Sequence, residues 1–236
     1  MVDLFGTTRW SLIVAAGRDD SRAHSALAEL CQAYWRPVYV FIRRKGHSTD
    51  DAADLTQGFF LHILEHHAIE RADQSRGRFR SYLLTAVRNF LETARLRDVT
   101  LRRGAGAPHE AIETIDVERR PSLSARDHAS SPERVFERHW ALNLTERALE
   151  SVRAEYASRG QERVFDELRP LLTSEAPASS PAGLDSTSAA DAAHRTALHR
   201  ARRRFGQALR AEIRETVNES GEVDEELRFL LRVLAD

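Results

Sequence analysis

Two short stretches of the sequence carry residues whose types and spacing could do chemistry. In the first, His62 and His66 stand four residues apart, with Glu65 beside the second histidine. Two histidines at this spacing on a helix can share a zinc ion while a glutamate acts as general base, which is the chemistry of a zinc-dependent hydrolase. The pattern is short and the chain has ten histidines, so a chance match is favoured. We expect no metal, no cofactor and no enzymatic activity.

The second stretch places arginines beside aromatic residues: Arg76, Arg78, Phe79, Arg80, Tyr82, Arg88, Asn89 and Phe90. Guanidinium groups bind the nucleic-acid backbone, and aromatic rings stack on unpaired bases. An asparagine amide can also read a base edge. The pattern indicates binding of single-stranded nucleic acid. Ordinary core packing stays the alternative for Phe79 and Tyr82.

The distribution of charge points to phosphate contacts at two places, although the whole chain carries a net charge of only -1. Residues 71–103 hold nine arginines against three acids, a net charge of +6. Residues 194–214 hold seven arginines against one acid, again +6, and residues 215–236 hold seven acids against two arginines, which gives -5. Basic segments attract phosphates, but a solvated helix face is an equal alternative for such a segment alone.

Helices must position these residues, because apolar side chains recur three or four residues apart and no strand pattern or repeat is present. Pro37 predicts a kink or a break in the first helix. Gly46 is typical of a helix end, and Ser48 with Asp51 is typical of a helix start. The predicted helices span residues 23–42, 48–63, 78–103, 132–156, 164–172, 189–213 and 223–234.

Periodicity is lost in residues 104–132, where Gly, Pro, Ser and mixed charge dominate. We therefore expect an all-α protein with two small helical domains, residues 1–103 and 133–236, joined by a flexible linker at 104–132. The single cysteine excludes an intramolecular disulfide framework and fits a reducing compartment. The apolar stretch at residues 12–16 is too short for a secretory signal or a membrane span, so a cytoplasmic location is expected.

Two segments carry a more specific resemblance. Residues 52–60 read Ala-Ala-Asp-Leu-Thr-Gln-Gly-Phe-Phe and resemble a signature of extracytoplasmic function (ECF) RNA polymerase sigma factors, in which an acidic pair precedes Leu-Thr-Gln-x-x-Phe. Residues 79–90 resemble the same family's Phe-Arg-x-aromatic-Leu and Arg-Asn segment. Residues 7–12 and 136–142 resemble a branch of the family with large insertions. The resemblance covers nearly the whole chain and is strongest from residue 26 to residue 97.

The resemblance implies roles for particular residues. The second helix would bind the largest subunit of core RNA polymerase through Asp54, Leu55, Gln57, Phe59 and Phe60. One of the two adjacent phenylalanines is expected to face this partner. The third helix would capture and help to melt the promoter −10 element through Arg78, Arg80, Tyr82, Arg88 and Asn89. Promoter DNA is the second implied partner, and an anti-sigma or other regulatory protein is a further candidate.

The C-terminal half departs from the family. Residues 197–205 resemble the end of a DNA-recognition helix. The helix that should support it would fall near residues 179–187, where Pro181 and Gly183 disfavour a helix. We therefore predict a degenerate helix-turn-helix-like domain that contacts the −35 element, or only phosphates, through Arg195, His199, Arg200, Arg202, Arg203 and Arg204. The acidic segment 222–226 is expected to fold against this basic helix.

The sequence thus favours an ECF-type sigma factor that directs core RNA polymerase to promoters and aids −10 melting. The first alternative is a sigma-like, polymerase-binding regulator that has lost −35 recognition. The second alternative is the zinc-dependent hydrolase.

Overall fold

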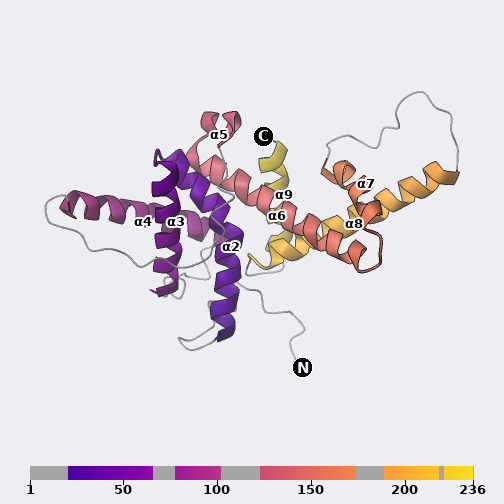
Figure 1. Ribbon diagram of the computed structural model, residues 1–236, viewed down its shortest axis with the longest axis horizontal. Helices are drawn as coiled ribbons and strands as arrows, with labels where there is room; N and C mark the ends of the chain where they lie inside the picture. The colour runs from indigo at the N-terminus through magenta and orange to yellow at the C-terminus, as the bar shows by residue number, and fades with distance from the viewer. Residues whose placement is uncertain (1–20, 66–77, 102–122, 174–188, 218–220, 236) are drawn as a thin grey trace. The chain divides into compact units, whose positions relative to one another are not determined.

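The computed structural model describes residues 21–65, 78–101, 123–173, 189–217 and 221–235 (Figure 1). Every regular element among these residues is a helix, which confirms the predicted all-α class. Three parts of the predictions lie outside the described residues: residues 179–187, where the support helix would fall, residues 104–122 of the predicted linker, and His66. In chain order the helices are α2 (Ser21–Arg44), α3 (Thr49–Glu65), α4 (Phe79–Leu101), α5 (Ala125–Ala129), α6 (Pro132–Ala157), α7 (Glu162–Thr173), α8 (Ala189–Arg214) and α9 (Glu222–Ala235).

Residues close in sequence define the boundary between α2 and α3. Helix α2 runs through Pro37 to Arg44, so the predicted break is wrong. Gly46 then adopts a φ of 99°, the left-handed conformation that glycine adopts without a steric penalty. The hydroxyl oxygen of Ser48 accepts the backbone N–H of Asp51 at 3.1 Å and caps α3, as predicted.

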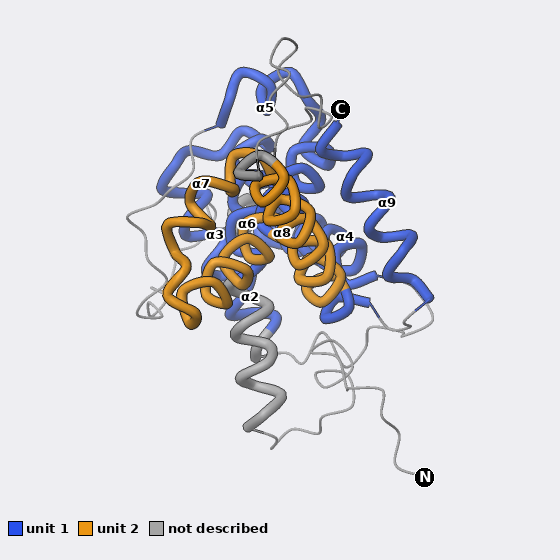
Figure 2. The backbone as a smooth tube through the Cα atoms, turned by 90° about the vertical axis from the view of Figure 1, so that its right-hand side faces the viewer, with its two compact units in different colours: residues 1–143, 214–236 blue, residues 144–213 orange. Residues whose placement is uncertain are grey.

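The chain divides into two compact units (Figure 2). The first comprises residues 1–143 and 214–236, and the second comprises residues 144–213. The boundary therefore falls inside α6, and α9 belongs to the first unit, whereas the sequence analysis placed both helices in a second domain. The physical reason is packing, because the rings of Trp140 in α6 and Phe229 in α9 lie 6.0 Å apart, within one unit. The functional roles predicted for the two domains stay predictions.

The first unit is built on a core of aromatic and branched side chains. Tyr34 in α2 contacts the ring of Phe79 edge-on, with 4.8 Å between centroids. The indole N–H of Trp140 donates a hydrogen bond of 3.0 Å to the buried hydroxyl of Tyr34. This core fixes the positions of α3 and α4. Its buried side chains include Val38, Phe41, Ile42, Phe59, Phe60, Ile63, Leu83, Val87, Val135, Phe136, Val223 and Leu230.

A short helix and one arginine fix the entry into α6. Ser124 and Asp127 form a reciprocal capping box at the start of α5. The Arg44 guanidinium donates to the backbone carbonyls of Asp127, His128 and Ser130 at 2.7–3.1 Å. The end of α2 is thereby tied to the segment that leads into α6.

The second unit has its own smaller core. Tyr156 and Phe165 pack with ring centroids 5.7 Å apart, and Ala201 of α8 is fully buried against the same cluster. The other buried members are Leu149, Val152 and Leu168. Helix α8 is thus held by side chains of α6 and α7.

Candidate polymerase and nucleic-acid interface

Helix α3 presents polar groups at its N-terminal half. Asp54 is exposed, and Leu55 and Gln57 are half-buried. Thr56, by contrast, is buried, and its hydroxyl donates to the Ala52 carbonyl at 2.6 Å. Carboxylates in the first turns of a helix are favoured by the positive end of the helix dipole. The exposed Asp54 side chain is available to a protein partner, and Leu55 and Gln57 are partly accessible beside it.

The two phenylalanines of α3 are buried and cannot contact a partner in this conformation. Phe59 and Phe60 are 1% and 4% exposed, and the Phe59 ring lies 5.6 Å from that of Phe90 in α4. The expectation that one of them faces a partner is wrong. The reason is that α3 packs against both α2 and α4, so its buried face is wider than a single stripe.

Helix α4 begins in the core of the first unit. Phe79 is buried, and its backbone N–H donates to the carbonyl of Thr216 at 3.2 Å. Arg80, expected to contact DNA, is only 9% exposed. Its side chain points into a protein environment, and its predicted role as a DNA contact does not fit this burial.

The partners of Arg80 come from distant parts of the chain. Its Nε and Nη2 donate to the two carboxylate oxygens of Glu226 in α9, at 2.5 and 3.3 Å. Glu226 is itself 1% exposed. The guanidinium carbon also lies 3.7 Å from the ring centroid of Phe229 and 5.4 Å from that of Trp140. A buried arginine is stabilised by such a bidentate carboxylate and aromatic faces, so Arg80 acts here as a structural anchor.

Arg78 lies at the edge of the same cluster. One Nη atom lies 2.8 Å from Glu225 and the other lies 3.0 Å from Glu226. Its side chain remains 23% exposed, and that of Glu225 is 62% exposed. The acidic segment therefore pairs with the start of α4. The sequence predicted that this segment would pair with the basic helix 195–204, but Glu225 and Glu226 pair with Arg78 instead.

Further along α4, Arg88 and Asn89 are exposed. Arg88 donates to Glu133 in the first turn of α6 at 2.7 Å. Partial burial raises the pKa of Glu133, but the hydrogen bond and positive charge of Arg88 outweigh it and hold that pKa below its ordinary value. Tyr82 is half-buried, and burial raises the pKa of its hydroxyl to about 12. It therefore stays protonated and neutral at physiological pH.

The sequence analysis missed the acidic and aromatic partners of these arginines. These partners lie between 45 residues (Arg88 to Glu133) and 149 residues (Arg80 to Phe229) along the chain from the arginines they contact. The net charge of the C-terminal segment was a sequence signal for Glu225 and Glu226, and it does not identify their partner.

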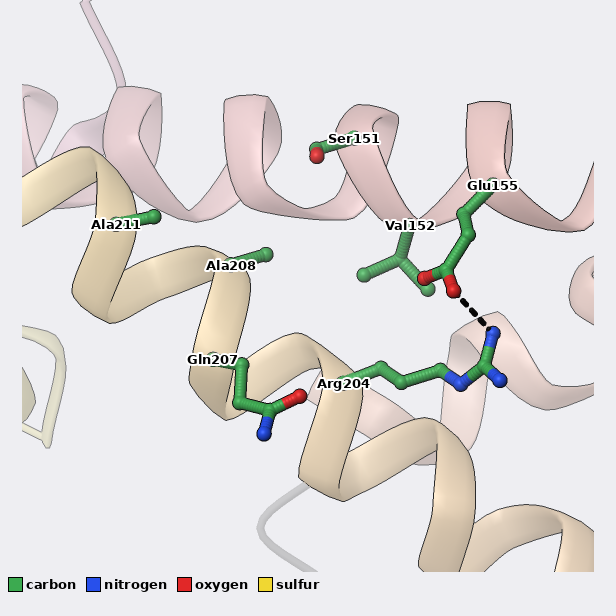
Figure 3. A pocket seen from close by; sticks show the side chains of 7 residues that line it. All are labelled: Ser151, Val152, Glu155, Arg204, Gln207, Ala208 and Ala211. Carbon is green, nitrogen blue, oxygen red and sulfur yellow. Dashed lines mark hydrogen bonds and ion pairs between the residues drawn. The ribbon is translucent and has the colours of Figure 1, made fainter.

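In the second unit, most of the predicted phosphate-binding residues are exposed on α8: Arg195, His199, Arg200, Arg202 and Arg203. Arg202 nevertheless donates to the Leu171 carbonyl at 3.3 Å. Arg204 is half-buried and pairs with Glu155 at 2.6 Å, at one end of a shallow groove between α6 and α8 (Figure 3). The other side chains that line the groove are Ser151, Val152, Gln207, Ala208 and Ala211.

The zinc pattern has little support in the described structure. The His62 ring lies 5.7 Å from the ring of Phe90. His66, the second predicted ligand, is outside the described residues. Within the described part of the chain, no group of three His, Cys, Asp or Glu side chains is placed to hold a metal ion.

The exposed groups of α3 and α4 are charged and hydrogen-bonding side chains suited to binding protein and nucleic acid. Residues 30–98, which contain α3 and almost all of α4, match the family model described as sigma-70 region 2. The match supports a sigma-factor-like role in RNA polymerase binding and transcription initiation, which is not an enzymatic one. Comparisons with curated proteins and with solved structures found no match. Among the described residues, no helix has the length and hydropathy needed to cross a membrane.

Proposed function

We propose that this protein is an ECF-type sigma factor, which binds core RNA polymerase through α3 and presents α4 to the promoter −10 element. The observation that carries the proposal is the sigma-70 region 2 match, because it falls on the α2–α4 segment that exposes polar side chains on α3 and α4. A cytoplasmic location follows from the proposed partner.

The proposed polymerase contact consists of Asp54, Leu55 and Gln57. The exposure of Asp54, the partial exposure of Leu55 and Gln57, and their place on the first half of α3 support this assignment. Phe59 and Phe60 support the contact indirectly. Both rings are buried, and the packing of Phe59 against Phe90 of α4 fixes the orientation of the helix.

The proposed −10 contact uses Arg78, Tyr82, Arg88 and Asn89. The arginines bind backbone phosphates, Tyr82 offers a ring for an unpaired base, and Asn89 reads a base edge. Arg80 leaves this set because Glu226 and Phe229 already occupy its guanidinium.

Exposed Asp54 and half-buried Gln57 of α3 allow a direct test. Asp54→Ala and Gln57→Ala should each weaken co-purification with purified core polymerase by about fivefold or more, the effect of losing a contact that contributes at least about 1 kcal/mol. Asp166→Ala, an exposed acid on α7, is the matched control. Wild-type binding by both α3 variants, with unchanged circular dichroism spectra, would remove the assigned surface.

A sigma-like regulator that has lost −35 recognition is the second candidate. The observation that favours it is the engagement of Arg204 by Glu155 and of Arg202 by the Leu171 carbonyl, which reduces what α8 can offer to bases. Run-off transcription decides between the two. A sigma factor starts transcription with core polymerase alone and responds to changes in both promoter elements, whereas the regulator does not respond to changes at −35.

A further inference from the structure

Two arginines of the candidate nucleic-acid surface, half-buried Arg78 and exposed Arg88, are held by carboxylates from outside the α2–α4 bundle. Arg78 pairs with Glu225 of α9, and Arg88 pairs with Glu133 of α6. These side chains are 23%, 62%, 46% and 31% exposed, respectively. The Arg80–Glu226 pair between them in sequence is different, because its side chains are 10% and 1% exposed. The surface thus combines one fixed pair with two that solvent reaches.

Solvent-exposed ion pairs are weak and can exchange partners. Water and salt screen them, and most contribute little to stability. A guanidinium binds carboxylate and phosphate with the same fork of N–H donors, so a backbone phosphate can replace either glutamate. Arg88 can therefore leave Glu133 for DNA, and Arg78 can leave Glu225. Arg78 also lies 3.0 Å from the buried Glu226, but Arg80 keeps that carboxylate paired when Arg78 leaves. Arg80 itself cannot leave without exposing the buried carboxylate.

We propose that Glu133 and Glu225 determine the specificity of DNA binding by competing with backbone phosphates for Arg88 and Arg78. This inference rests on the proposed promoter-binding function. The competition lowers affinity for duplex of any sequence, because phosphate contacts supply most non-specific binding. Base contacts, such as those proposed for Asn89, then contribute a larger share of the total affinity, so binding depends more on the DNA sequence.

The placement of the two glutamates supports this role. Each stands in the first turn of its helix, where the helix dipole favours a carboxylate. Each also meets α4 from a distant part of the chain, 45 residues away for Glu133 and 147 for Glu225. The pKa of Glu133, held below its ordinary value against the effect of burial, agrees with a carboxylate that is charged when DNA arrives.

The test measures binding of the full chain to a fluorescent duplex of arbitrary sequence at low salt. Glu133→Gln and Glu225→Gln keep the size of the side chain and remove its charge. Each should raise affinity by about two- to fivefold, the range expected from exposed ion pairs. Glu150→Gln is the matched control, because Glu150 is an exposed acid on α6 that faces Arg153 at 3.9 Å. It changes the net charge equally and should raise affinity by less than the other two.

A double-mutant cycle separates competition from overall charge. In an Arg88→Ala background, Glu133→Gln should no longer raise affinity, because no guanidinium is left to release. Equal gains with and without Arg88, or an equal gain from Glu150→Gln, would overturn the inference while the proposed function stands. If Arg88→Ala also fails to weaken DNA binding, the proposed −10 surface fails as well. Circular dichroism of every variant checks that the fold is retained.

Discussion

Removal of the buried carboxylate of Glu226 is expected to destabilise the first unit strongly. Glu226→Ala takes away the partner that lies 2.5 Å from Nε of Arg80. It leaves a guanidinium that is 10% exposed, with Glu137 at 3.6 Å as its remaining carboxylate. Removing one partner of a buried ion pair costs about 3–5 kcal/mol. In a chain of this size 1 kcal/mol corresponds to about 2–4 °C, so Tm should fall by roughly 6–20 °C.

Thermal and urea unfolding followed by circular dichroism measure the effect. Glu225→Ala is the matched control, because the neighbouring Glu225 is exposed and its pair with Arg78 contributes only about 0–1 kcal/mol. A double variant, Arg80→Met with Glu226→Leu, tests the cause. It removes both buried charges together, so it should recover most of the lost stability.

The opposite pattern would refute this reasoning. A Tm change within about 2 °C for Glu226→Ala, and a double variant less stable than the single one, would mean that Arg80 reaches solvent. The sequence-based assignment of Arg80 as a phosphate contact would then regain its support.

Three further predictions concern single side chains. Asn89→Ala should change base preference at −10 in a promoter scan without changing the salt slope, because the amide carries no charge. Phe60→Ala should lower the free energy of unfolding by about 3–5 kcal/mol, because it empties a buried site. His139 is buried, and burial lowers the pKa of its imidazole. The neighbouring Asp127 raises that pKa, but the effect of burial is larger, so the pKa lies below its ordinary value. Its stabilising contribution is therefore complete above pH of about 6.5 and is lost as pH falls below that value. Tm should fall between pH 7.5 and 5.5, and His139→Gln should flatten that fall.

Each of these has a contradicting result. If Asn89→Ala lost affinity equally for all −10 sequences, Asn89 would help to position the DNA and would not read a base edge. An unchanged unfolding curve for Phe60→Ala, together with lost polymerase binding, would restore Phe60 to the polymerase contact. A Tm profile of His139→Gln parallel to that of the wild type would place the pH dependence in other groups.

Apart from α5, which lies within the predicted linker 104–132, the helices could be predicted from the sequence because their signals are local. The periodicity of apolar residues and the signals at Gly46 and Ser48 concern neighbours within a few residues, and the structure places the helix ends close to the predicted ones. The effect of Pro37 was harder to predict. A proline removes one backbone donor, and the packing of α2 around buried Tyr34 and Phe41 holds the helix together through it.

The candidate site was less predictable because its decisive contacts join distant residues. Exposed and buried arginines look the same in a sequence, so Arg78, Arg80 and Arg88 received one role. Two basic segments carry the same net charge of +6, so net charge could not show which of them pairs with the acidic C-terminal segment. Apolar packing makes that choice, since Val223 and Leu230 are buried in the first unit and bring the acidic end of α9 to α4.

The segment that carries the family match is not the whole of the folded unit that contains it. The match ends at residue 98, yet Arg80 is closed off by Glu226 and Phe229, and Tyr34 receives the indole N–H of Trp140. A chain cut after residue 98 would leave these two polar groups and the apolar face around them without partners, and both losses oppose folding. The C-terminal acidic helix is therefore part of the module that would meet polymerase and promoter. Its proposed competition for Arg78 is possible because apolar packing and the buried Arg80–Glu226 pair, rather than the Arg78–Glu225 pair, hold α9 in place.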